Sequence, residues 1–385
     1  MLVTTGGGEQ RVKILVLDTN VRYANPTPQS FLAALAQRAD VVMGGLGYGI
    51  DTSDIRALER AHGRFDAIVG QTWMFGEPGV GQYGAVVPRD LRDHPAPKVL
   101  NLLQMDPHAF PEYQYKACVI PADLVLSTVA SPQFRIADVA LDAPEEWFDP
   151  QALLVRNPDL IDERWLMVPH CLSEDEFVAV GSIKKKVDVT VLGIKYRFRA
   201  KAIEHLHSRR NLSCATLDGA FQRVLYYATT RYSVQRRVDL TPWFYRRFQR
   251  AIAGSRISIT CDASIGYAVR KFFEIPAFGS VLAARFFPEM AALGFQDGAN
   301  CFALQEDRLE RIDEIVGLLK SDSREAVRLA RTGQEMVWNC HRATVRAEQF
   351  LTALEAVVNG TYGGTRWRDG RQSLLRHAQP KASLH

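Results

Sequence analysis

A short stretch in the last third of the chain brings together residues that could bind a phosphorylated ligand. Arg270, Lys271 and Glu274 recur at helical spacing, so all three can share one face of a short helix. That helix is expected to open near Ala268. Adjacent cations at a helix N-terminus suit phosphate oxygens, and a carboxylate one turn further along can accept hydrogen bonds from both hydroxyls of a ribose. Gly279 then permits a tight return into the next strand. The alternative is a surface Arg–Glu pair on an ordinary connecting helix.

Two polar residues in the first half of the chain could act on a hydroxyl group. Asp106 and His108 come soon after the strand expected to end at Leu103, where side chains of a parallel sheet point into a ligand cleft. Either could orient or deprotonate an acceptor hydroxyl, so these two are the candidate catalytic residues. The alternative is a turn Asp before Pro107 beside a partly exposed His. His170, which follows a later strand, is interpreted as a hydrogen-bonded structural histidine.

Positive charge is concentrated in the middle of the sequence. The 385 residues include 47 Lys and Arg against 43 Asp and Glu, a formal net charge of +4. Between Lys184 and Arg256, 17 basic residues stand against 4 acidic ones, so the remainder of the chain is acidic. This distribution predicts that one anionic partner binds at one place. The partner could be nucleic acid, a nucleotide diphosphate or an anionic membrane surface. A solvated basic face without a ligand is the alternative.

Part of this region mixes arginines with aromatic residues. The members of the mixture are Arg236, Arg237, Trp243, Phe244, Tyr245, Arg246, Arg247, Phe248 and Arg250. Such a mixture could stack on nucleic acid and neutralise its phosphates. The apolar spacing from Leu240 to Ile252 is also that of an amphipathic helix packing on a sheet, and we favour this second interpretation. The acidic run Glu174–Glu176 is interpreted as a solvated turn.

Composition excludes several classes of protein. Hydrophobic residues make up 47% and charged residues 23%, as in soluble globular proteins, and no apolar run is long enough to cross a membrane. Residues 1–10 are expected to form a flexible leader without a signal core. The six cysteines lie far apart, which argues against a disulfide framework and a zinc site and leads us to expect a cytoplasmic protein. Gly45–Gly49 lacks the full dinucleotide fingerprint, so NAD binding is rejected.

Apolar, strand-like runs alternate with amphipathic stretches along most of the chain. The expected strands are residues 12–17, 41–43, 65–69, 98–103, 124–127 and 165–168, then 187–192, 214–217, 257–260 and 280–283. This alternation predicts parallel βαβ units in two tandem Rossmann-like domains that face each other across a cleft. We place the domains at residues 11–180 and 181–335. Long helices are expected at 307–319 and 323–354, with a break near Gly333, and residues 359–385 are expected to form a loosely ordered basic tail.

The order of several short motifs resembles that of the GT-B glycosyltransferases. Lys271–Gly279, KFFEIPAFG, is similar to the R-x-x-E-x-x-A-x-G segment of that family, with Lys271 at the Arg position. Upstream, Val191–Arg199, VLGIKYRFR, looks like the F-x-G-x-x-Y-x-x-R opening of the family's second domain. The closest resemblance is to the CgeB-like, spore-maturation-protein-type members, and it covers most of the chain.

The resemblance implies a GT-B fold and specific roles. The first domain would bind the acceptor, the second the nucleotide sugar, and a terminal helix at 336–358 would cross back to the first domain. Glu274 would bind the ribose, with Arg270 and Lys271 near the diphosphate. The phosphate-facing loop after the first strand of the second domain would contain Gly193, Lys195, Arg197 and Arg199. Gly266 stands where retaining members often have an acidic residue.

These features predict a glycosyltransferase that moves a sugar from a nucleotide diphosphate donor, with a UDP-sugar favoured, to an unknown acceptor. The resemblance implies a retaining reaction without a metal or another cofactor, in which fixed cations stabilise charge on the departing phosphate. The alternatives are a catalytically inactive GT-B-fold binding protein, a DNA-modifying glycosyltransferase and a nucleotide-sugar epimerase. Nucleic acid is therefore a less favoured partner than a nucleotide sugar.

Overall fold

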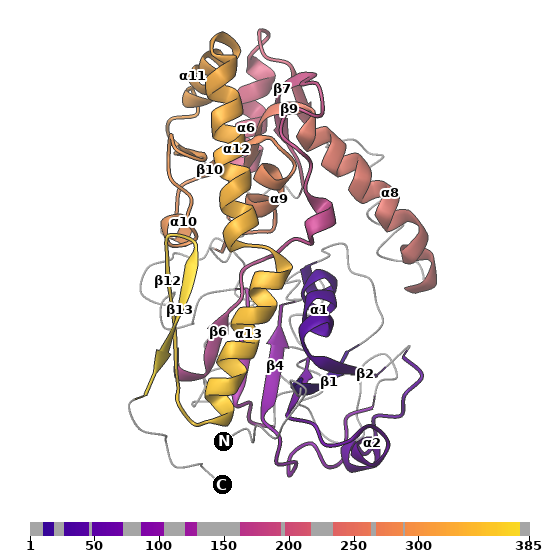
Figure 1. Cartoon of the computed structure of the whole chain (residues 1–385). Helices are drawn as coiled ribbons and strands as arrows, with labels where there is room; N and C mark the ends of the chain where they lie inside the picture. Colours follow the sequence, from indigo (N-terminus) through magenta and orange to yellow (C-terminus); the bar gives the residue numbers. More distant parts are fainter. Residues whose placement is uncertain are drawn as a thin grey trace.

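The strands of the protein form two parallel sheets, one in each half of the chain, and a separate hairpin (Figure 1). The computed structural model describes residues 11–18, 27–45, 48–71, 86–103, 120–128, 162–193, 197–216, 234–262, 267–287 and 289–377. For residues 234–242 and 244 it describes the backbone alone.

The first sheet has six parallel strands in the order β2-β1-β3-β4-β5-β6. They are β1 Lys13–Leu17, β2 Asp40–Gly44, β3 Ala67–Gly70, β4 Lys98–Leu102, β5 Leu124–Ser127 and β6 Trp165–Met167, preceded by the short helix η3 Asp162–Arg164. Ile14 and Val16 pack on one face with helix α1 Thr27–Arg38. Leu15 and Leu17 pack on the other face with helix α2 Ile55–His62. All six strands predicted for this half are confirmed; the apolar runs of all but the edge strand β2 are buried on both faces of the sheet.

The second sheet has five parallel strands in the order β11-β10-β9-β7-β8. They are β7 Val187–Val191, β8 Cys214–Thr216, β9 Ser255–Thr260, β10 Val281–Arg285 and β11 Phe302–Leu304. The helices of this half are α6 Arg197–Ser208, α8 Val234–Ala253, α9 Lys271–Ala277, α10 Glu289–Ala292, α11 Arg311–Ser321 and α12 Ser323–Cys340. The short helix η4 Glu174–Glu176 lies in the segment that connects the two sheets. No described helix is long and apolar enough to cross a membrane.

Two long helices end the second half and return to the first. Helix α12 runs without interruption through Gly333, so the predicted break there is wrong. Gly333 is needed for another reason: a Cβ at this position would lie 2.8 Å from the carbonyl oxygen of Asn300. The terminal helix, α13, spans Ala343–Val358 and therefore begins later than the expected 336. It packs beside α1, where the rings of Phe31 and Phe350 are 5.8 Å apart (Figure 1).

The expected basic tail at 359–385 is also wrong for most of its described length. Strands β12 Tyr362–Arg368 and β13 Arg371–Arg376 pair as an antiparallel hairpin. The hairpin touches both domains: Tyr362 Oη donates a hydrogen bond to the carbonyl oxygen of Trp165 at 2.8 Å, and the amide of Gly370 donates one to that of Ala292 at 2.9 Å. Tertiary contacts of this kind order a segment whose composition predicts no structure.

Candidate functional site

Two cationic side chains converge on a glycine at the carboxyl end of β7. Gly193 has φ +100°, a conformation that side-chain-bearing residues rarely adopt. A Cβ there would also lie 2.6 Å from Lys271 Nζ and 2.9 Å from Arg199 Nη1, so both groups point at the same small space. Arg199 comes from the first turn of α6 and Lys271 from the first residue of α9. The glycine thus leaves room for two cations beside the end of the strand.

Lys271 has no carboxylate partner in the part of the chain that the structure describes. Among the described residues its ammonium group makes no hydrogen bond or ion pair, and its nearest ring is that of Phe248, 5.8 Å away. Burial, followed by the charge of Arg199, lowers the pKa of Lys271 to about 8. Arg199 is 1% exposed and donates to neutral acceptors, Cys261 Sγ at 3.3 Å and the carbonyl oxygen of Leu192 at 3.2 Å. An anion bound at this place would relieve the repulsion between the two cations.

The neighbouring Arg270 lies in the opposite kind of environment. It is buried, and its Nη2 donates to both carboxylate oxygens of Glu176, at 2.6 and 2.9 Å. Its Nη1 donates to Glu274 Oε1 and to Tyr245 Oη. Burial alone would lower the pKa of Arg270, but Tyr245 and the two carboxylates raise it well above its ordinary value. Arg270 is therefore a permanently charged centre of a buried network.

This network joins the two domains. Arg270 Nε donates to Thr27 Oγ1, at the start of α1, over 3.1 Å. The same hydroxyl lies 3.1 Å from Nδ1 of His170, which confirms His170 as a hydrogen-bonded structural histidine. Burial, and then the charges of Arg270 and Lys271, lower the pKa of His170 to about 3, so it is neutral. The network thus fixes the first domain against the helix that bears Glu274.

Glu274 uses only one of its carboxylate oxygens in the network. Its Oε1 accepts from Arg270 and lies 3.1 Å from Tyr245 Oη. Its Oε2 accepts no hydrogen bond from the described residues, although the side chain is nearly buried. A ligand hydroxyl could therefore bind Oε2 while Oε1 holds the carboxylate in place.

The remaining candidate residues are distributed differently. Asp106, His108, Lys195 and Gly266 lie outside the described residues. Gly279 has φ +74° and lies against the backbone of Val178, where it makes the return into β10. The structure therefore brings together Gly193, Arg199 and Lys271 in one group and Arg270 with Glu274 in another.

The sequence suggested that the basic residues between 184 and 256 serve one anionic partner at one place. In the structure, several of the described ones pair with carboxylates instead. Arg197 Nε lies 3.0 Å from Glu306, which also pairs with Lys201, and Arg209 Nε lies 3.2 Å from Asp313. Folding brings acidic residues from after position 300 against this basic segment. Arg197 thus pairs with a carboxylate, and the local charge is partly neutralised.

Sequence reasoning missed three members of the site. Glu176 was interpreted as part of a solvated turn, but its carboxylate is buried against Arg270. Its local signal was the Ser173–Glu176 capping box, which fixes the turn and aims the carboxylate inward. Tyr245 was noted only as a member of the arginine and aromatic mixture, and Thr27 gave no chemical signal, so neither could be assigned to this network from the sequence.

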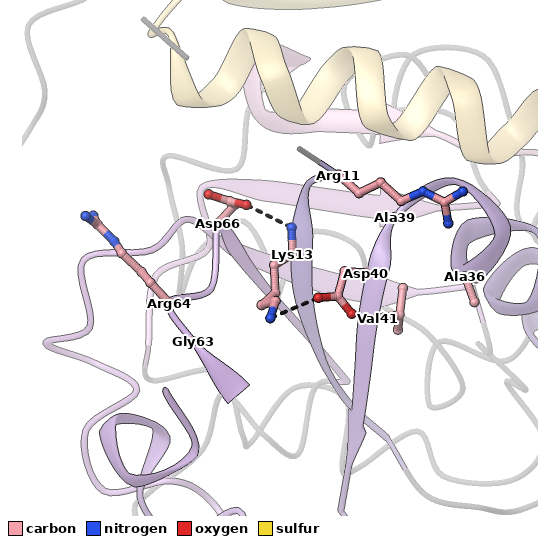
Figure 2. A pocket seen from close by; sticks show the side chains of 9 residues that line it. All are labelled: Arg11, Lys13, Ala36, Ala39, Asp40, Val41, Gly63, Arg64 and Asp66. Atoms are coloured by element: carbon pink, nitrogen blue, oxygen red, sulfur yellow. Dashed lines mark hydrogen bonds and ion pairs between the residues drawn. The ribbon is translucent and has the colours of Figure 1, made fainter. Parts of the chain in front are cut away.

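The described residues also line a hollow of about 820 Å³ at the other edge of the first sheet (Figure 2). It lies at the amino ends of β1 and β2, where Lys13 Nζ pairs with Asp40 at 2.9 Å and the Lys13 amide donates to Asp66 at 2.8 Å. The residues that line the hollow all come from the first domain and none belongs to the site at the domain junction, so the two are separate. Among the described residues, no group of three His, Cys, Asp or Glu side chains could hold a metal ion.

Comparison with known proteins gives matches of structure alone. No family model matches the sequence, and no curated protein is significantly similar to it. A glycosyltransferase from Rickettsia africae is 8% identical with a TM-score of 0.52, over 91% of this chain and 100% of that one. Sucrose-phosphate synthase from Thermosynechococcus elongatus is 12% identical with a TM-score of 0.52, over 89% and 98%. The Anabaena protein HepE in complex with UDP-glucose is 13% identical with a TM-score of 0.50, over 89% and 99%.

These similarities extend over both domains of each solved structure. Together with the six-stranded and five-stranded parallel sheets, they confirm the GT-B fold with two Rossmann-like domains. At identities this low the comparisons establish the architecture, and a function has to be argued from the site itself.

Proposed function

We propose that the protein is a glycosyltransferase that uses a nucleotide diphosphate sugar as its donor. The observation that carries the proposal is the pair of cations at Gly193, of which Lys271 lacks an anionic partner among the described residues. One turn along the same helix, Glu274 offers a carboxylate oxygen for a ribose hydroxyl.

The chemistry of glycosyl transfer fits these groups. Cleavage of the glycosidic bond to the donor leaves additional negative charge on the departing diphosphate. Lys271 and Arg199 are fixed before the ligand arrives, so they can stabilise that charge without reorganisation. This supports a reaction that needs no metal ion.

Several finer features belong to the same proposal. A UDP-sugar is the favoured donor, and the Anabaena neighbour was solved with UDP-glucose. The first domain would bind the acceptor, with Asp106 or His108 positioning its hydroxyl. A retaining reaction and membership of the CgeB-like group rest on the sequence resemblance, and a cytoplasmic location rests on the spacing of the cysteines.

Calorimetric titration with UDP and 2′-deoxy-UDP tests the proposal. We expect UDP to bind about 10-fold to 100-fold more tightly than the deoxy analogue, because hydrogen bonds to charged groups contribute about 1.5–3 kcal/mol. Glu274→Gln should abolish most of this preference, whereas Glu314→Gln, an exposed control on α11, should retain it. Absence of binding to both UDP and GDP by the unmodified protein would contradict the proposal.

Turnover separates an enzyme from a binding protein of the same fold. UDP-glucose incubated with a broad acceptor panel should give transfer or slow hydrolysis. A protein that binds UDP and consumes none of a range of UDP-sugars would instead be the catalytically inactive alternative.

A further inference from the structure

The outer face of α8 carries a stripe of basic residues and one tryptophan. Trp243, Arg246, Arg247 and Arg250 recur at the i, i+3, i+4, i+7 spacing of a single helix face, and all four are exposed. Trp243 is 43% exposed, which is high for so large a side chain. We call these four residues the α8 stripe. Figure 1 shows α8 along an outer edge of the second domain.

The inner face of the same helix is already occupied. Phe248 and Ile252 are buried in the core of the second domain, and Tyr245 joins the network around Arg270. Over residues 245–252 the apolar side of the helix is therefore used within the second domain, and the α8 stripe is the face that stays exposed among the described side chains.

The positive charge of the α8 stripe is not compensated within the described residues. None of its three arginines forms an ion pair there, and Arg247 lies over the ring of Trp243 at 5.6 Å. Other described arginines near the surface do have such partners, as in Arg38–Glu348, Arg328–Glu325 and Arg342–Glu174, whereas the α8 stripe places three unpaired arginines on one helix face. Like charges three and four residues apart destabilise a helix, so internal stability does not account for the α8 stripe.

We propose that the α8 stripe docks the protein on an anionic membrane surface. Its three guanidinium groups complement lipid phosphates, and an exposed tryptophan beside them suits the headgroup region, where Trp is enriched. The α8 stripe runs along one face of the helix, so it can contact a flat surface along its length. Tyr245 connects the opposite face of α8 to Glu274, so docking would place the donor site about one helix diameter from the bilayer.

Vesicle sedimentation at low salt tests the docking. We expect the full chain to bind vesicles that contain phosphatidylglycerol and not to bind vesicles of pure phosphatidylcholine. The triple variant Arg246→Gln, Arg247→Gln, Arg250→Gln should bind about 100-fold more weakly. A matched triple variant, Arg308→Gln, Arg324→Gln, Arg331→Gln, removes the same charge from exposed positions on and near α11 and α12 and should bind within about twofold of the wild type. Thermal unfolding of both variants checks that they remain folded.

Tryptophan fluorescence gives a second measurement. Vesicle binding should shift the emission to shorter wavelength, and Trp243→Ala should remove that shift. The proposal is wrong if the wild type stays in the supernatant with anionic vesicles, or if both triple variants lose binding equally. It is also wrong if the α8 stripe binds an oligonucleotide with steep salt dependence and the protein ignores vesicles, since the stripe would then be a nucleic-acid surface.

Discussion

Arg270 and Lys271 are consecutive in the chain, yet their side chains lie in opposite surroundings. Arg270 is buried among Glu176, Glu274 and Tyr245, and it reaches across to Thr27 in the first domain. Lys271 points toward Gly193 and Arg199, and no described carboxylate is within ion-pair distance. One cation is satisfied by the protein, and the other has no anionic partner among the described residues, which is why we propose that it binds a ligand.

The contrast separates two uses of buried charge. Removing one partner of a buried ion pair lowers the stability of the fold, because the other charge is left buried without compensation. Removing an unpaired, partly buried cation has the opposite effect on stability. The folded state is stabilised, and only the affinity for an anion is reduced. We therefore expect substitutions at the two positions to affect different quantities, Arg270 the stability and Lys271 the affinity.

The largest effect is expected from Arg270→Met, which leaves the carboxylates of Glu176 and Glu274 buried and unpaired. The free energy of unfolding should fall by about 3–5 kcal/mol, measured by urea or thermal denaturation. Adding Glu176→Gln should restore part of the loss, since it removes one of the stranded charges. A destabilisation well under 1 kcal/mol would mean that the network does not hold the domains together.

Lys271→Met should weaken the binding of UDP by about 10-fold to 100-fold, because a charge-assisted contact to phosphate is lost. The thermal stability should stay the same or rise, which distinguishes this variant from Arg270→Met. Lys184→Met, at an exposed position in the segment before β7, is the matched control and should bind UDP normally. Calorimetry measures the affinity of all three proteins. Unchanged affinity in Lys271→Met would remove Lys271 from the site.

The sequence predicted the strands and the pairing at Arg270 for local reasons. Apolar runs such as Lys98–Leu102 specify buried strands, and the i, i+4 spacing of Arg270 and Glu274 places both on one side of α9. The spacing could not reveal that Arg270 also binds Glu176, which lies 94 residues earlier in the chain. Glu176 looked like a solvated residue because its neighbours are charged, and only the tertiary structure buries it.

The hairpin β12–β13 escaped prediction for a related reason. Its strands contain glycines and arginines without the apolar alternation of a half-buried sheet. Tyr362 and Gly364 are buried because β12 packs against β6 and η3, elements nearly 200 residues distant. At Gly333 the error was opposite: a glycine taken as a helix break is used for close contact with Asn300. Both cases depend on contacts between distant segments, which no local pattern encodes.

The pH dependence of UDP binding should follow Lys271. Its pKa is lowered to about 8, so the group is cationic below that pH and neutral above it. Because we propose that this cation binds the diphosphate, the affinity should fall about tenfold between pH 7 and pH 9. The folded pKa lies below the unfolded value of 10.5, so the free energy of unfolding should rise over pH 8 to 10.5. Lys271→Met should flatten both profiles.

The smallest effect is expected from Thr27→Val, which keeps the shape of the side chain and removes the hydroxyl shared by Arg270 and His170. Loss of this interdomain hydrogen bond should lower the free energy of unfolding by about 1 kcal/mol. UDP affinity should change less than twofold, because Thr27→Val leaves the two cations at Gly193 in place. If Thr27→Val instead weakened UDP binding as much as Lys271→Met does, the two environments would be coupled. The division between a cation for structure and a cation for ligand would then have to be abandoned.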